Sequence, residues 1–180
     1  GGRSRLPLGG DPAVDPNHIE FPFLVAVNTQ GEEKWWHASS DIRDGAFDTF
    51  QWLDLRQGPG DSLFLLGQAT RGDEDRFFME RMDVPGGQSS WFHWLDSEQS
   101  GNNPWTPSGL EVHPQGRLYL SSTRVDDAGV LLEAKITAFD LSGDYLWETS
   151  STALGLDPLQ PVDMLQTENG ATYVVHERWN

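Results

Sequence analysis

Thr137-Ala-Phe-Asp-Leu-Ser-Gly-Asp-Tyr-Leu-Trp147 is the stretch that decides the fold, because two earlier stretches match it. They are Val25-Ala-Val-Asn-Thr-Gln-Gly-Glu-Glu-Lys-Trp35 and Arg81-Met-Asp-Val-Pro-Gly-Gly-Gln-Ser-Ser-Trp91. Gly31, Gly87 and Gly143 are spaced 56 residues apart, and the three final tryptophans keep the same spacing. Two positions that hold one period across three copies indicate an internal repeat.

Two further motifs recur with nearly the same period. The first places an acid between apolar residues, in Trp52-Leu-Asp-Leu, Gly109-Leu-Glu-Val and Pro161-Val-Asp-Met. The second is Ser62-Leu-Phe-Leu-Leu, Arg117-Leu-Tyr-Leu-Ser and Ala171-Thr-Tyr-Val-Val. Short stretches of this kind, rich in β-branched and aromatic residues and bounded by Gly, Pro, Asn and Asp, are typical of strands. The sequence therefore predicts an all-β chain with four short antiparallel strands in each unit. The acid-containing stretch is the first strand and the Leu-Phe/Tyr-Leu stretch is the second. The third strand ends at the Asn or Asp, and the fourth strand, entered through a hairpin turn at the Gly, carries the Trp.

Asp140-Leu-Ser-Gly-Asp-Tyr-Leu-Trp147, which follows Gly116-Arg-Leu-Tyr-Leu, resembles the tryptophan-containing blades of quinoprotein-like β-propellers. It is also similar to a bacterial extracellular propeller repeat. The resemblance implies four-stranded blades around a common axis, with each repeat tryptophan docking one blade on the next. It also implies an exported protein, extracellular or periplasmic.

The positions of the four strand motifs along the chain predict how it divides into blades. We expect an N-terminal extension over 1–20, a half blade over 21–49, blades over 50–105 and 106–160, and a half blade over 161–180. Three blades are few for a closed ring. The alternatives are a three-bladed monomer, a ring completed by a second copy of the chain, and a piece of a longer propeller.

Composition limits the partners. The 180 residues carry a net charge of −16, which disfavours nucleic acids and anionic membrane surfaces. The longest apolar runs are far shorter than the roughly 20 residues of a membrane-spanning helix. Without cysteine, the chain has no disulfide and no zinc–thiolate site. Neutral glycans, basic proteins and cations remain compatible partners.

The acids of the first strand are candidate metal ligands. Asp54, Glu111 and Asp163 occupy the same place in three successive units. In a propeller this strand lines the central channel, so the three carboxylates could form a ring that suits Ca²⁺. The alternative is that each carboxylate accepts hydrogen bonds from neighbouring backbone and holds the blades together.

Surplus aromatic residues are candidate ligand contacts. Trp94 and Trp105 flank a long polar connection that contains Asn102 and Asn103, and Trp52 lies on a first strand. Exposed indoles beside amides and carboxylates are typical of a glycan platform. The alternative is that the indoles pin the long connection to the blades.

The sequence lacks the nucleophile-elbow, phosphate-loop and zinc-protease motifs. We therefore expect a non-enzymatic binding or scaffold module that recognises a glycan or a protein through its loop face, with no cofactor apart from the Ca²⁺ considered above. One alternative is part of a propeller hydrolase or lyase that uses the channel carboxylates. The other is an assembly subunit that recruits another chain by strand pairing.

Overall fold

The structure is a computed structural model, and it describes residues 2–4, 21–38, 47–72, 74–95, 105–151, 160–166 and 172–177. In chain order its strands are β1 (Gly2–Ser4), β2 (Phe21–Val27), β3 (Glu33–His37), β4 (Thr49–Gly58), β5 (Ser62–Arg71), β6 (Glu74–Asp83), β7 (Gln88–Leu95), β8 (Thr106–His113), β9 (Arg117–Val125), β10 (Leu131–Asp140), β11 (Tyr145–Ser150), β12 (Gln160–Gln166) and β13 (Thr172–Glu177). The described residues contain no helix, and hence none long and apolar enough to cross a membrane. The prediction of an all-β chain is confirmed.

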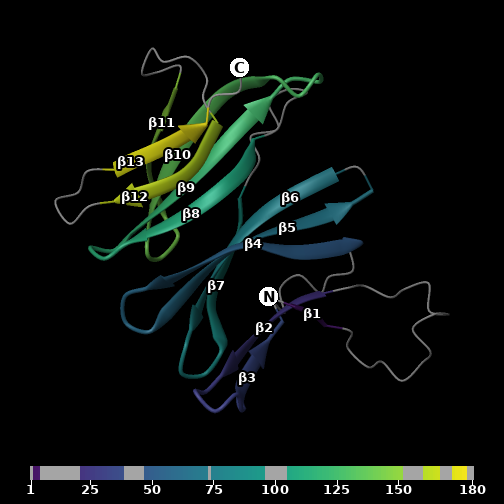
Figure 1. The fold of residues 1–180 in the computed structure, drawn as a ribbon, viewed down its shortest axis with the longest axis vertical. Helices are drawn as coiled ribbons and strands as arrows, with labels where there is room; N and C mark the ends of the chain where they lie inside the picture. Colours follow the sequence, from purple (N-terminus) through teal and green to yellow (C-terminus); the bar gives the residue numbers. More distant parts are fainter. Residues whose placement is uncertain are drawn as a thin grey trace.

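The described strands form antiparallel sheets in simple chain order. Strands β4-β5-β6-β7 make the first full sheet, and β8-β9-β10-β11 make the second full sheet. Strands β1-β2-β3 form the N-terminal sheet, and β12-β13 form the C-terminal hairpin. The N-terminal sheet and the C-terminal hairpin lie at opposite ends of the molecule, with the first full sheet between them (Figure 1). The four-stranded antiparallel units predicted from the repeat are therefore present.

One strand falls within the predicted N-terminal extension. Strand β1 pairs with the first three residues of β2, with Ser4 opposite Phe21. An exposed strand edge presents unpaired N–H and C=O groups, which any nearby extended segment can pair with. The sequence of this region has no strand pattern that would have predicted the pairing.

Three hairpin turns have the same hydrogen-bond pattern. In each, a side-chain oxygen of Asn28, Asp126 or Asp140 accepts hydrogen bonds from the backbone N–H groups two and four residues later. The third residue after it is a glycine with positive φ, +83° at Gly31 and +84° at Gly143. Left-handed backbone of this kind disfavours residues with a Cβ, which explains why a glycine follows the Asn or Asp by three residues in each of these turns.

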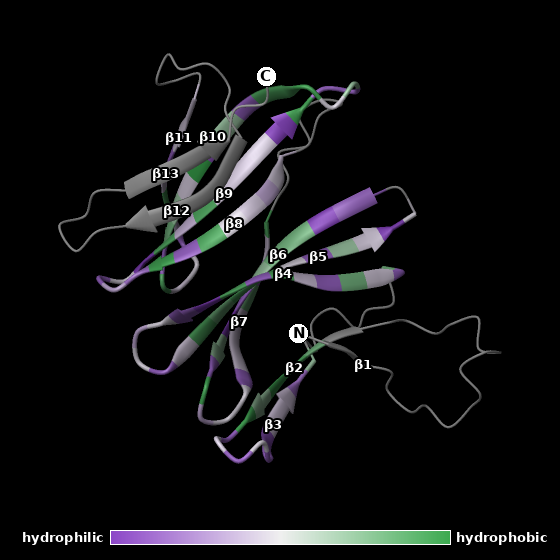
Figure 2. Ribbon diagram, viewed as in Figure 1, coloured by the Kyte–Doolittle hydropathy of each residue, from purple (hydrophilic) through white to green (hydrophobic). Residues whose placement is uncertain are grey.

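Both faces of the first full sheet are covered. Along many strands hydrophilic and hydrophobic residues alternate (Figure 2). One face packs against the second full sheet through a buried cluster: Phe64, Leu66, Met79, Leu110, Leu118 and Leu120. The other face carries a second cluster: Phe47, Phe50, Ala69 and Phe78, with Trp52, Phe92 and Trp94 packed against it. Two-sided burial explains the continuous apolar runs in β5 and β6.

Two of the three repeat tryptophans join neighbouring sheets. Trp35 of β3 lies on the turn between β6 and β7, so closely that a Cβ added at Gly87 would be 2.6 Å from its ring. Trp91 of β7 lies on the next such turn, 3.4 Å from the corresponding position at Gly143. Its Nε1 donates a hydrogen bond to the carbonyl oxygen of Leu141, at 3.0 Å. The same tryptophan-on-glycine joint therefore forms twice, one repeat apart.

The first strands of successive units lie side by side. Strand β4 contacts β8, and β8 contacts β12. The Oδ2 atom of Asp54 on β4 accepts a hydrogen bond from the backbone N–H of Leu110 on β8, at 3.0 Å. The first strands β4, β8 and β12 therefore lie next to one another in chain order, and the fourth strands β7 and β11 lie at the other edges of their sheets.

Candidate binding cleft between the full sheets

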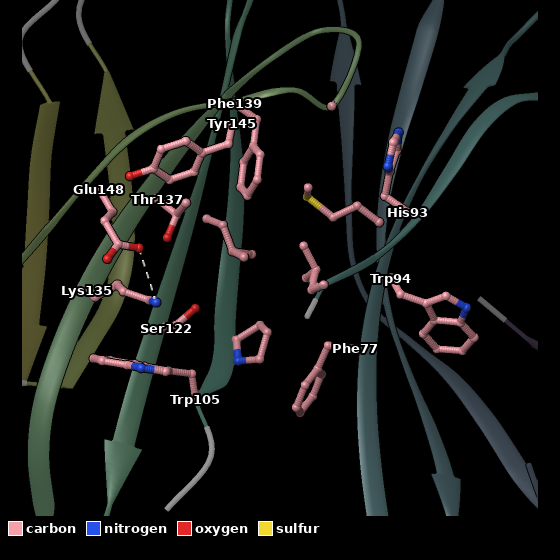
Figure 3. Close-up of a pocket in the computed structure, with 15 residues that line it drawn as sticks. Phe77, His93, Trp94, Trp105, Ser122, Lys135, Thr137, Phe139, Tyr145 and Glu148 are labelled. Atoms are coloured by element: carbon pink, nitrogen blue, oxygen red, sulfur yellow. Dashed lines mark ion pairs between the residues drawn. The ribbon is translucent and has the colours of Figure 1, made fainter. Parts of the chain in front are cut away.

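A cleft of about 330 Å³ lies between the first and second full sheets (Figure 3). Its wall on the first full sheet carries Phe77 and Met79 of β6 and His93 and Leu95 of β7. Residues two apart on a strand face the same side, which places these four side chains on one surface. This wall is mainly apolar, and it continues the core cluster between the two sheets.

The opposite wall, called the polar wall below, combines four polar side chains with the apolar or aromatic side chains of Trp105, Pro107, Leu120, Phe139 and Tyr145. Ser122 of β9 lies opposite Lys135 of β10, and Thr137 of β10 lies opposite Glu148 of β11. The four side chains project from the second full sheet toward the apolar wall (Figure 3). Together they offer hydrogen-bond donors and acceptors to a ligand. The facing apolar wall excludes part of the water from this site.

Lys135 is the central charge of the cleft. It is one of two lysines in a chain of net charge −16, and it is 13% exposed. Its Nζ lies 3.3 Å from Oε2 of Glu148 and 4.5 Å from the centre of the Trp105 ring. Arg124 lies over the same ring, at 5.2 Å. Cation–π and ion-pair contacts thus neutralise Lys135 and hold the indole in place.

Two aromatic side chains border the polar wall. Tyr145 of β11 is 59% exposed and meets Phe139 edge to face at 6.5 Å. Trp105 immediately precedes β8 and is half-buried. Tyr145 is therefore the aromatic ring of this wall that is more accessible to a ligand.

The structure separates the predicted ligand residues. Only Trp105 places its ring in the cleft, whereas the indole of Trp94 points away from it (Figure 3). Trp94 packs on Phe78 at 5.7 Å and under Arg76 at 4.5 Å. Trp52 packs on the same phenylalanine at 5.4 Å, so both indoles belong to the second core cluster. The two predicted asparagines, at positions 102 and 103, lie outside the described residues.

The acids of the first strands are held by protein groups where their side chains are described. Asp54 forms an ion pair with Nη1 of Arg56, and Oε2 of Glu111 lies 3.5 Å from Nε of the same arginine. With its bond to the backbone of β8, Asp54 matches the alternative in which the acid holds neighbouring units together. Asp163 lies on β12, and its side chain is outside the description. The described residues contain no group of three potential metal-ligating side chains, and a Ca²⁺ site stays a prediction.

Sequence reasoning missed most of the polar wall. Lys135 was one available signal. Side chains alternate between the two faces of a strand, so a lysine flanked by apolar residues marks which face is polar. Its pairing with Glu148 depends on the register of β10 with β11, which shifts at a bulge between Ala138 and Phe139. A bulge of this kind has no reliable sequence signature.

Comparison of the chain with protein families, with curated proteins and with solved structures finds no match. What the cleft can bind is therefore inferred only from the residues that line it.

Proposed function

We propose that this chain is a non-enzymatic β-propeller module that binds a neutral glycan in the cleft between its full sheets. For the propeller arrangement, the support is the line of adjacent first strands together with the tryptophan-on-glycine joint that recurs at Trp35 and Trp91. An exported location remains a prediction from the sequence resemblance.

The observation that carries the glycan proposal is the composition of the two facing walls. Sugar rings present hydroxyl groups at their edges and apolar C–H groups on their faces. Ser122, Thr137 and the Lys135–Glu148 pair offer partners for hydroxyls, and Phe77 and Tyr145 offer surface for the C–H faces. The volume of about 330 Å³ lies at the lower end of small-ligand pockets, which corresponds to a short oligosaccharide segment.

Charge narrows the class of glycan further. Lys135 is already paired with Glu148, and the whole chain carries a net charge of −16. Sulfated or uronic-acid glycans would meet overall repulsion without a free cation in the described part of the cleft to offset it. Neutral glycans avoid this penalty.

Glycan-array binding with matched variants tests the proposal. We expect Tyr145→Ala and Thr137→Val to reduce binding of neutral glycans at least about tenfold, the effect of losing one good contact. Trp36→Ala is the control, because Trp36 is 50% exposed and lies on β3, outside the cleft. Arrays without signal would overturn the glycan proposal, and signal on peptide arrays alone would point to a protein partner.

A further inference from the structure

Trp147, the third repeat tryptophan, is held within its own sheet in the same way as Trp91. Among the described residues, however, no glycine turn packs against it. Trp91 is supported within its own sheet by Phe64, with ring centres 6.0 Å apart. Trp147 of β11 is supported in the same way by Tyr119 of β9, at 5.9 Å. Trp147 is nevertheless 38% exposed. Among the described residues, nothing takes the place that the Gly143 turn takes for Trp91.

The turn at Gly31, at the other end of the molecule, matches the kind of turn that Trp147 lacks. Gly31 has a φ of +83°, and its turn has the hydrogen-bond pattern of the Gly143 turn, including an Asx side chain that accepts two backbone bonds. Gly87 and Gly143 are each covered by aromatic rings of the preceding sheet. A Cβ added at Gly31 meets nothing within 4 Å in the described structure.

We propose that these two features are the halves of one joint between copies of this chain. Trp147 of one copy packs on the Gly31 turn of a second copy. By analogy with the bond from Trp91 to Leu141, its Nε1 donates to the backbone carbonyl of Thr29, the residue in the same place of the turn. The inference rests on the repeated joint of the proposed propeller and does not require a ligand in the cleft.

A second copy is the occupant that the structure favours. Trp147 and Gly31 lie on elements at opposite ends of the molecule, so the described chain does not bring them together (Figure 1). The same docking would bring the N-terminal sheet of the second copy next to the two-stranded C-terminal hairpin. Strand β1, which pairs with the first three residues of β2, would have to leave that edge for β2 and β3 to become the third and fourth strands of a full sheet. Each copy offers one half of the joint at each end, and two copies can therefore close on each other through two identical joints.

Sedimentation of the full chain, measured over a range of concentrations, tests the joint. We expect a dimer of twice the 20.1 kDa chain mass, and Trp147→Ala should weaken the dimer at least about 30-fold, as expected for a central interface tryptophan. Gly31→Ala should weaken it as well, because its Cβ enters the space of the incoming ring. Val130→Ala and Gly129→Ala are matched controls, since Val130 is 59% exposed and Gly129 has a φ of +79° in a turn of the same pattern.

Disulfide trapping locates the contact. The chain contains no cysteine, so introduced thiols report on single positions. The position of His93, which is 3.0 Å from the added Cβ at Gly143, corresponds to Thr149 one repeat later. Mixing a Thr149→Cys chain with a Gln30→Cys chain, which keeps the glycine of the turn, should therefore give a mixed disulfide dimer.

The outcomes separate this inference from the glycan proposal. A strictly monomeric chain, or a dimer that tolerates both joint variants, would overturn the joint. A dimer that is lost in both joint variants and kept in both controls would support it, whatever the glycan arrays show. Circular dichroism of each variant establishes that the strands remain folded.

Discussion

The contact between Trp35 and the Gly87 turn is the place to perturb first. Gly87 has a φ of +63°, and the Cβ of an alanine there would lie 2.6 Å from Cδ2 of Trp35. Gly87→Ala therefore combines two costs, a strained backbone and a collision with the indole. Gly129→Ala carries only the first cost, because its φ of +79° is similar and its Cβ would meet nothing within 4 Å in the described structure.

The two costs can be given rough sizes. An alanine in left-handed backbone costs about 1–2 kcal/mol, which is the whole effect expected for Gly129→Ala. Forcing a packed ring to move costs about 1–3 kcal/mol more, so Gly87→Ala should destabilise by about 2–5 kcal/mol. Gly143→Ala should fall between them, since its Cβ would lie 3.0 Å from the His93 ring.

Equilibrium unfolding in urea, followed by circular dichroism, measures the three free energies of unfolding. The expected order of destabilisation is Gly129→Ala, then Gly143→Ala, then Gly87→Ala. If Gly87→Ala and Gly129→Ala differ by less than about 0.5 kcal/mol, the ordinary scatter of surface substitutions, the indole of Trp35 does not rest on this turn. The reasoning about joints would then be wrong for all three repeats.

Two further predictions concern contacts between sheets. His37→Ala should cost about 1–3 kcal/mol in urea unfolding, because it removes the hydrogen-bond partner, 3.0 Å away at Nε2, of Oε1 of Glu80, a side chain with no exposure. Adding Glu80→Gln to that variant should recover part of the loss, and no recovery would argue against the pair. Trp91→Phe keeps most of the ring but removes the bond to the Leu141 carbonyl, so a loss of about 1 kcal/mol is expected in the same assay. A neutral result would mean that the indole N–H contributes nothing to the joint.

The repeat explains why so much of the fold was predictable. A fixed spacing of four residues from Gly to Trp, with an Asn or Asp three or four residues before the Gly, specifies a turn and the strand that follows it. Strands joined by short turns pair in chain order. The alternation of side chains along a strand could also have corrected the prediction that Trp94 contacts a ligand. Trp91 and Trp94 are three residues apart on β7, so their side chains must face opposite sides of the sheet. If Trp91 docks on the next unit, Trp94 faces the previous one.

Contacts across sheets were beyond the reach of sequence. His37 and Glu80 are 43 residues apart, and nothing in either strand marks one as the partner of the other. Their meeting depends on how the N-terminal sheet stacks on the first full sheet. The cleft has the same origin, because its two walls come from different sheets and its polar wall depends on a bulged register.

The joint between sheets also implies how cooperativity spreads through the molecule. A full sheet contacts chiefly the units before and after it. The free energy of unfolding of each unit therefore depends on whether its neighbours are folded. The first full sheet is flanked on both faces and should open last, whereas terminal units should fray first. We expect one whole 56-residue unit to be the smallest length that can be added or deleted while the remaining joints keep their register.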